Sequence, residues 1–246
     1  MSIKNCLGRF CLAFCAIIVI FATLKKAKTT VMTTHPLWTD EYWLPLLKIY
    51  MARPEGVKPM YSRAVVDLAL ELHIPPQFIY KQMFRLRRPD SLWLTRLRDK
   101  YAANPKRLSR DVKKLHRMSG FSSDGGFYDG VEVSETFEKD FRPISGCGDL
   151  KPVMLVMALD LYFRLTPITM VADTPEVIQL ARLMRIKPQQ VVDVLTMFQT
   201  LDPYLHRSHP ESSPLFDACR DVWHRYGNDD PEALSSLAAQ LREYFS

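Results

Sequence analysis

A few histidines and cysteines near the C-terminus are the residues with the most obvious capacity to bind a metal ion. His206 and His209 stand three positions apart, a spacing that suits two ligands on one helical turn, and Pro210 follows them directly. A proline there ends any helix, and the spacings to Cys219 and His224 match no familiar zinc pattern. We therefore predict no metal site and ordinary structural roles for these four side chains.

Nucleophilic and phosphate-binding chemistry have equally little support in the sequence. Cys147 lies in a Ser-Gly-Cys-Gly segment typical of an exposed loop, and no histidine stands in a recognisable partner motif for a cysteine nucleophile. The acids between Asp124 and Asp140 do not follow the spacing of a calcium loop, and the glycine-rich phosphate-binding motifs are absent from the sequence. The sequence therefore predicts that the chain is not an enzyme and uses neither a cofactor nor a small-molecule substrate.

Basic residues are concentrated in one region of the chain. The formal net charge of +6 is misleading, because residues 1–31 contain five Lys or Arg and no acid. The remainder carries 28 Lys or Arg against 27 Asp or Glu, but residues 81–117 hold thirteen Lys or Arg against three Asp. Solvation of a helical face is the simplest interpretation of such charges, and a surface for nucleic acid is the alternative.

Residues 10–24 form an uninterrupted apolar run of 15 residues. A membrane-spanning helix needs about 20 apolar residues, and a signal peptide needs a small-x-small cleavage site that this segment lacks. Three interpretations stay open: an uncleaved anchor, a signal peptide, or a true translation start at Met32 rather than Met1. Only two of the five cysteines lie outside residues 1–31, which favours a reducing compartment. We expect a cytoplasmic protein, with inner-membrane anchoring through residues 10–24 as the alternative.

The elements that must position these residues belong to a globular protein. Hydrophobic residues make up 47% and charged residues 24% of the 246 residues, a composition unlike that of disordered or disulfide-rich chains. The length suits one large domain or two of roughly 100–125 residues. Only nine glycines beside 17 prolines argue against a turn-dense β-sandwich.

Comparison of the chain with itself indicates an internal duplication. Residues 44–90 align with residues 156–202 without a gap, and nine of these 47 positions are identical where chance would give about three. The identical pairs are Leu47/Leu159, Tyr50/Tyr162, Val65/Val177, Leu68/Leu180, Ala69/Ala181, Ile74/Ile186, Pro76/Pro188, Gln77/Gln189 and Asp90/Asp202. After about a dozen extra residues in the second copy the match resumes with the pairs Tyr101/Tyr226, Leu108/Leu234 and Leu115/Leu241.

Each copy is predicted to contain five helices. Apolar residues recur at helical spacing, and capping residues or prolines stand where helices should begin. In the first copy, the first expected helix covers residues 41–52, the second starts at Ser62 and the third at Pro76. The fourth contains Trp93, Leu94, Leu97 and Tyr101, and the fifth starts at Asn104-Pro105. In the second copy, the first expected helix covers residues 153–165, the second starts at Thr174 and the third at Pro188. The fourth contains Phe216, Cys219, Val222 and Tyr226, and the fifth starts at Asp230-Pro231.

A segment of different composition separates the two copies. Residues 119–150 hold six of the nine glycines and five Phe or Tyr, and residues 124–160 carry eight acids against three bases. We expect this connector to pack on one or both copies and its acids to dock on the basic face of the first. The predicted fold is therefore all-α. Its segments are an apolar N-terminal segment (1–31), helical repeat 1 (32–118), the acidic Gly/aromatic connector (119–150) and helical repeat 2 (151–246).

The second and third helices of each copy resemble a helix-turn-helix at the level of the motif. The residues that carry the resemblance are Leu68-Ala69, Leu72, Ile74 and Ile79, and in the second copy Leu180-Ala181, Met184, Ile186, Val191 and Val194. The sequence departs from the motif at His73 and Arg185, where the family prefers glycine in the turn, and at Gln82, where an apolar residue is usual.

The resemblance implies that the third helix of the first copy would read DNA. The residue types that suit base-edge and phosphate contacts there are Gln77, Tyr80, Lys81, Arg85 and Arg88, supported by Lys106, Arg107, Lys113 and Lys114 further along. The matching helix of the second copy contains no Lys or Arg, so two half-sites cannot be read symmetrically.

Taken together, these features predict a non-catalytic helical protein that binds a macromolecule. A protein partner is the first expectation. The alternative is a DNA-binding transcriptional regulator that contacts nucleic acid through residues 77–117, and a membrane is expected only if residues 10–24 form a genuine anchor.

Overall fold

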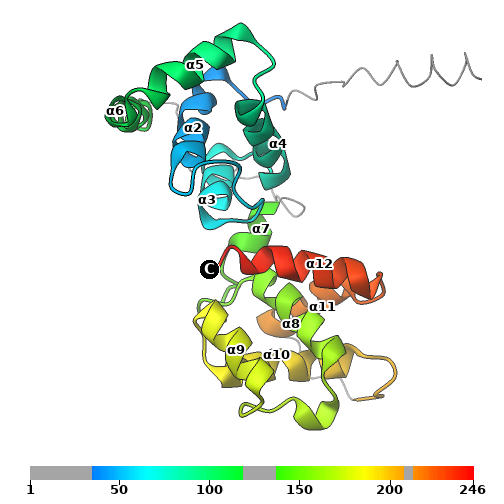
Figure 1. Ribbon diagram of the computed structural model, residues 1–246. Helices are drawn as coiled ribbons and strands as arrows, with labels where there is room; N and C mark the ends of the chain where they lie inside the picture. The colour runs from blue at the N-terminus through cyan, green and yellow to red at the C-terminus, as the bar shows by residue number, and fades with distance from the viewer. Residues whose placement is uncertain (1–34, 119–136, 208–212) are drawn as a thin grey trace, which may run out of the picture. The chain divides into compact units, whose positions relative to one another are not determined.

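The computed structural model describes residues 35–118, 137–207 and 213–246 (Figure 1). Every regular element in these ranges is a helix, so the predicted all-α class is confirmed. All the elements below belong to the compact unit Leu37–Ser246. Within the described ranges, no helix combines the length and the apolar character that crossing a bilayer requires. The apolar run 10–24 and the connector up to residue 136 lie outside the described residues.

The first group of helices is built around α2. Its elements are η1 (Asp40–Tyr42), α2 (Trp43–Met51), α3 (Arg63–Leu72), α4 (Pro76–Arg87), α5 (Leu92–Ala102) and α6 (Pro105–Leu115). Helix α2 packs against α3, α4 and α6, while α5 bridges α4 and α6. Apolar residues at i, i+3, i+4 and i+7 of α3 face this core, which is why a short amphipathic helix is stable here. Those residues are Val65, Leu68, Ala69 and Leu72.

The second group is built around α8 in a related way. Its elements are α7 (Phe137–Phe141), α8 (Pro152–Arg164), η2 (Pro167–Thr169), α9 (Pro175–Met184), α10 (Pro188–Leu201), α11 (Pro214–Tyr226) and α12 (Pro231–Arg242). Helix α8 packs against α7, α9, α10, α11 and α12, and every residue from Pro152 to Tyr162 is buried. A helix that is covered on all sides tolerates apolar residues all round, as α8 has.

Both turns at the helix-turn-helix-like positions are left-handed. His73 ends α3 with φ 55° and Arg185 ends α9 with φ 59°. The next residue closes each turn in the same way: Ile74 N donates to Ala69 O at 3.0 Å, and Ile186 N donates to Ala181 O at 3.0 Å. These bonds satisfy helix-terminal carbonyls, and they hold two non-glycine residues in a conformation that normally favours glycine.

Helix α7 links the two groups of helices. Tyr61 and Val66, which flank the start of α3, are buried in the same core cluster as α8. The Tyr61 ring stacks on Phe141 of α7 with the ring centroids 6.3 Å apart. His73 Nδ1 lies 2.8 Å from Oε1 of Glu138, a carboxylate that is buried in α7. The described end of the connector is therefore packed into the protein, as its aromatic composition predicts.

Candidate macromolecule-binding surface

The residues predicted to read DNA are only partly available on α4. Gln77, Lys81 and Arg88 are exposed, whereas Tyr80 and Arg85 are half-buried. Gln77 Nε2 also donates to the Tyr61 hydroxyl at 3.0 Å. The exposed stripe of α4 is therefore narrower than the sequence predicts.

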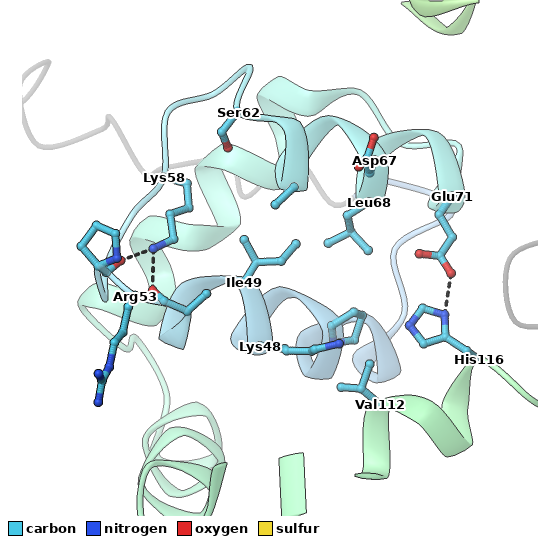
Figure 2. A pocket seen from close by; sticks show the side chains of 14 residues that line it. Lys48, Ile49, Arg53, Lys58, Ser62, Asp67, Leu68, Glu71, Val112 and His116 are labelled. Carbon is cyan, nitrogen blue, oxygen red and sulfur yellow. Dashed lines mark hydrogen bonds and ion pairs between the residues drawn. The ribbon is translucent and has the colours of Figure 1, made fainter. Parts of the chain in front are cut away.

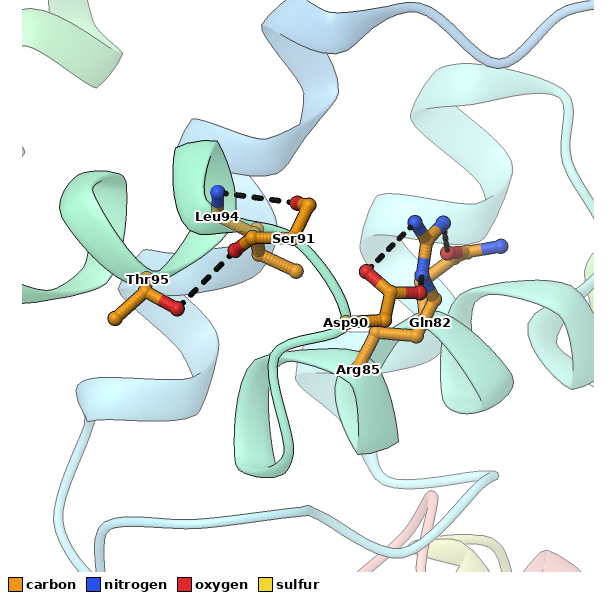
Figure 3. Close-up of polar contacts among 6 residues, drawn as sticks. All are labelled: Gln82, Arg85, Asp90, Ser91, Leu94 and Thr95. Carbon is orange, nitrogen blue, oxygen red and sulfur yellow. Dashed lines mark hydrogen bonds and ion pairs between the residues drawn. The ribbon is translucent and has the colours of Figure 1, made fainter.

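Arg85 is held by contacts within the protein (Figure 3). Its Nε and Nη2 donate to the Asp90 carboxylate at 2.7 and 3.2 Å, and its Nη1 donates to Gln82 Oε1 at 2.9 Å. The guanidinium also lies over the Trp43 ring, 5.0 Å from its centroid. These contacts satisfy the buried Gln82, the polar residue that departs from the helix-turn-helix pattern, so Arg85 acts as a structural anchor.

The corner between α4 and α5 exposes apolar side chains. Of the apolar residues that the sequence places in the fourth helix, Trp93 is 49% exposed, and its neighbour Leu92 is 77% exposed. Phe84 on α4 is 44% exposed and meets Tyr80 edge-on. Leu94 of the same helix is buried, and Ser91 caps α5 by accepting from Leu94 N at 3.3 Å (Figure 3).

Helix α6 presents a nearly continuous basic face. Its apolar residues Leu108, Val112 and Leu115 are buried, which turns the opposite side of the helix to solvent. The exposed cations of this face are Lys106, Arg107, Arg110, Lys113, Lys114 and Arg117, here called the α6 basic face. Four of them were predicted; Arg110 and Arg117 belong with them by helical spacing, a signal that was present in the sequence.

One acid lies within the α6 basic face. Asp111 is 3.7 Å from Arg107 Nε and accepts from the Tyr101 hydroxyl at 3.0 Å. Burial and this hydrogen bond raise the pKa of Tyr101. Asp111 therefore ties α6 to α5 and offsets only a small part of the positive charge.

The two predicted sets of basic residues lie on different sides of α2. Helix α2 packs against both α4 and α6, and Figure 1 shows α4 and α6 on opposite sides of it. A single straight ligand cannot lie along both exposed faces at once. The structure thus separates Lys81 and Arg88 from the α6 basic face.

Two described acids of the connector, Glu138 and Asp140, have partners outside residues 81–117. Glu138 pairs with His73 and, at 2.9 Å, with Arg142 of its own helix. Asp140 receives two hydrogen bonds from Arg225, at 3.0 and 2.9 Å, and these raise the arginine's pKa against the opposing effect of burial. The acids from Asp124 to residue 135 lie outside the described residues.

The candidate metal ligands do not converge in the described part of the chain. His206 and His224 are exposed, Cys219 is fully buried, and His209 lies outside the described residues. No group of three or more potential ligands occurs among the described residues. Burial raises the pKa of Cys219 to about 12, and it also raises that of Cys147, so both thiols are held in the weakly nucleophilic protonated form.

The chain matches no protein-family model, no curated protein and no solved structure. Its function has to be inferred from its own geometry.

Proposed function

We propose that the body of this protein consists of two copies of one five-helix unit. Three of the five helix pairs begin at the positions that the sequence alignment matches. Helices α3 and α9, and likewise α4 and α10, begin 112 residues apart. Helices α6 and α12, which follow the extra residues of the second copy, begin 126 residues apart. The central helix packs on the second, third and fifth helices in both groups. Equivalent helices in equivalent contacts are what a duplicated unit requires.

Burial of matched side chains supports the duplication. Tyr50 and Tyr162 are 9% and 5% exposed, and both Ala69 and Ala181 are fully buried where α3 meets α4 and α9 meets α10. The other matched pairs in the core are Leu47/Leu159, Val65/Val177, Leu68/Leu180, Leu72/Met184, Ile79/Val191, Met83/Leu195, Leu86/Phe198, Leu108/Leu234 and Leu115/Leu241. The shared left-handed turn at His73 and Arg185 adds a backbone feature that composition alone would not produce.

We further propose that the protein is a non-catalytic binding protein whose α6 basic face binds an acidic protein partner. The single observation that carries this proposal is the five exposed cations on one side of α6, with a sixth, Arg117, just after its C-terminus. Like charges one helical turn apart repel one another, so such a face lowers the stability of the free protein. Binding of an acidic partner would relieve this repulsion. The matching helix α12 carries Arg242 as its only Lys or Arg, so the feature belongs to the first unit alone.

A protein partner is favoured over duplex DNA for two reasons. Arg85, the arginine best placed by the helix-turn-helix resemblance to read bases, is engaged with Asp90 and Gln82. In addition, the α6 basic face does not continue the exposed stripe of α4, so the third helix would have to bind DNA with little phosphate contact from residues 106–117.

DNA binding through α4 remains the second candidate. Gln77 and Lys81 lie one turn apart on the exposed side of α4, and the exposed Arg88 follows its last residue; these side chains suit base edges and phosphates. This candidate keeps the helix-turn-helix-like crossing of α3 and α4 and uses the third helix of the first unit as the reader.

Charge reversal separates the two candidates. The full chain is titrated, by fluorescence anisotropy at low salt, into a labelled Glu-rich peptide and separately into a labelled DNA duplex. The double variant Lys113→Glu/Lys114→Glu tests α6, and Lys81→Glu/Arg88→Glu is its matched control on α4. We expect the α6 variant to weaken peptide binding about tenfold or more and the α4 variant to leave it nearly unchanged.

The DNA candidate predicts the opposite pattern. Duplex binding would then fall with salt by about 0.9 log units per log unit of salt for each phosphate contacted, and the α4 variant would abolish it. Peptide binding that is equally strong in the α6 variant, or absent from the unmodified chain, would refute the proposal.

A further inference from the structure

A groove of about 520 Å³ lies between α2, α3 and α6 of the first unit (Figure 2). Ile49, Leu68 and Val112 form its apolar floor, one from each helix. Its volume is in the range of small-molecule sites, which are mainly apolar with a few polar groups that fix the ligand. It is separate from the α6 basic face, because Val112 is on the buried side of α6.

One end of the groove contains an uncapped helix N-terminus. Ser62 is the N-cap residue of α3, but its side chain makes no capping hydrogen bond. Among the described residues its Oγ is the one side-chain polar atom that is shielded from solvent without a hydrogen-bond partner, and Figure 2 shows it turned toward the groove. A buried hydroxyl without a partner is unfavourable, and a bound acceptor or donor would satisfy it.

Lys58 supplies a positive charge at the same end. Its Nζ donates to Ala52 O at 2.7 Å and to Pro54 O, which holds the ammonium at the wall of the groove. An ammonium has three N–H groups, so one donor is left after these two bonds. In the first turn of α3 the Val65 N–H donates to Ser62 O at 2.9 Å, whereas the N–H groups of Arg63 and Ala64 have no acceptor within the helix, and Ala64 lines the groove.

The other end of the groove contains a carboxylate next to a histidine. Glu71 Oε1 lies 2.6 Å from His116 Nδ1, on the far side of the apolar floor from Ser62 and Lys58 (Figure 2). Asp67 also lines the groove, and so do two further cations, Lys48 and Arg53. The lining as a whole therefore favours an anion, and Lys58 together with the N-terminus of α3 places the anion-binding end at Ser62.

The second unit has none of these features at the matching positions. Lys58 corresponds to Met170, which is 6% exposed and whose Sδ accepts from the buried Gln199. Ser62 corresponds to Thr174, whose hydroxyl donates to Thr169 O at 2.5 Å. Ile49 corresponds to Leu161, which is 2% exposed. The copies thus differ where the first one has an open groove, a free hydroxyl and a cation.

We propose that this groove binds a small carboxylate with an aliphatic body. The carboxylate accepts hydrogen bonds from Ser62, from the remaining N–H of Lys58 and from the first turn of α3, while the aliphatic body covers Ile49, Leu68 and Val112. This site is independent of the α6 basic face, so either proposal can fail without the other.

Calorimetric titration of the full chain with octanoate tests the site, with octanol as the uncharged probe of the same length. We expect octanoate to bind about tenfold more tightly than octanol, and Lys58→Met and Ser62→Ala each to weaken octanoate binding about fivefold or more. Thr174→Ala is the matched control in the second unit and should bind octanoate like the unmodified chain. Ala64→Trp, which fills the groove from the exposed side of α3, should abolish binding and serves if Lys58→Met does not fold.

Three results would overturn the proposal. One is the absence of octanoate binding at millimolar concentration, and another is equal affinity for octanoate and octanol. The third is octanoate affinity that survives Ser62→Ala and Ala64→Trp in variants whose circular dichroism is unchanged, which would place the ligand elsewhere on the chain.

Discussion

At the scale of single residues, the structure shows how polar side chains can occupy core positions where the sequence pattern favours an apolar residue. Gln82 and Gln199 are both buried, and each is satisfied by a neighbour: Gln82 by Arg85, and Gln199 by Met170. A polar residue at a core position is tolerated only with such a partner. The partner of Gln82 is itself one of the arginines that a nucleic-acid interpretation would leave free.

The structural role of Arg85 leads to a stability prediction. Arg85→Met removes the donor to Gln82 and the ion pair with Asp90, and it leaves a buried amide oxygen unsatisfied. We expect the free energy of unfolding to fall by about 1–3 kcal/mol, measured by urea denaturation. Lys81→Met, one turn away on the exposed stripe, should change it by less than about 0.5 kcal/mol. Equal effects of the two substitutions would mean that Arg85 does not anchor α4.

At the scale of helices, local signals in the sequence are sufficient to place most starts. Pro76 and Pro188 open α4 and α10, and Asn104 caps α6 by accepting from Arg107 N at 3.0 Å. The apolar spacing of α6 predicts which side is buried and hence which cations are exposed. These features depend on residues within one turn of each other, and they are therefore visible without tertiary information.

Features that depend on tertiary packing could not be predicted in this way. The open groove depends on how the loop from Arg53 to Tyr61 leaves α2 and returns to α3, which no periodicity encodes. Trp93 and Leu94 are neighbouring apolar residues of α5, and only tertiary packing decides that Leu94 is buried while Trp93 is 49% exposed. The short helix α7 was not predicted, because five residues are too few for a periodic signal.

The left-handed turns give a prediction at the level of the helix pair. A non-glycine residue in this conformation costs about 1–2 kcal/mol, and glycine loses part of that advantage through its flexibility in the unfolded chain. Arg185→Gly should therefore raise the free energy of unfolding by about 0.5–1 kcal/mol, measured by thermal denaturation. Arg185 suits this test better than His73, whose replacement would also remove the contact with Glu138.

A substitution to glycine one turn earlier, inside helix α9, provides the control for Arg185→Gly. Arg182 is exposed in the last turn of α9, where the backbone is right-handed helical. Arg182→Gly should lower the free energy of unfolding by about 1 kcal/mol. If both substitutions were destabilising to the same extent, the turn at Arg185 would not be strained.

At the scale of the whole Leu37–Ser246 unit, a small number of contacts join the two groups of helices. Tyr61 and Val66 contribute to the core around α8, and the pair His73–Glu138 adds a polar contact next to them. Phe141 lies at the centre of this junction, with its ring 6.3 Å from that of Tyr61 and 5.2 Å from that of Tyr244. The groups should therefore unfold together as long as the junction is intact.

Phe141→Ala tests that coupling. Phe141 is 5% exposed, so truncation should cost about 3–5 kcal/mol, and the loss falls at the junction, within the core cluster that also contains α8. We expect calorimetry of the unmodified chain to give one transition for the two groups and the variant to give two, with hydrogen exchange fastest in α3 and α7. Phe163→Ala, at a ring that is 45% exposed on α8, should lower stability less and keep one transition. A single, merely shifted transition in Phe141→Ala would mean that the two groups of helices do not depend on this aromatic junction for their cooperativity.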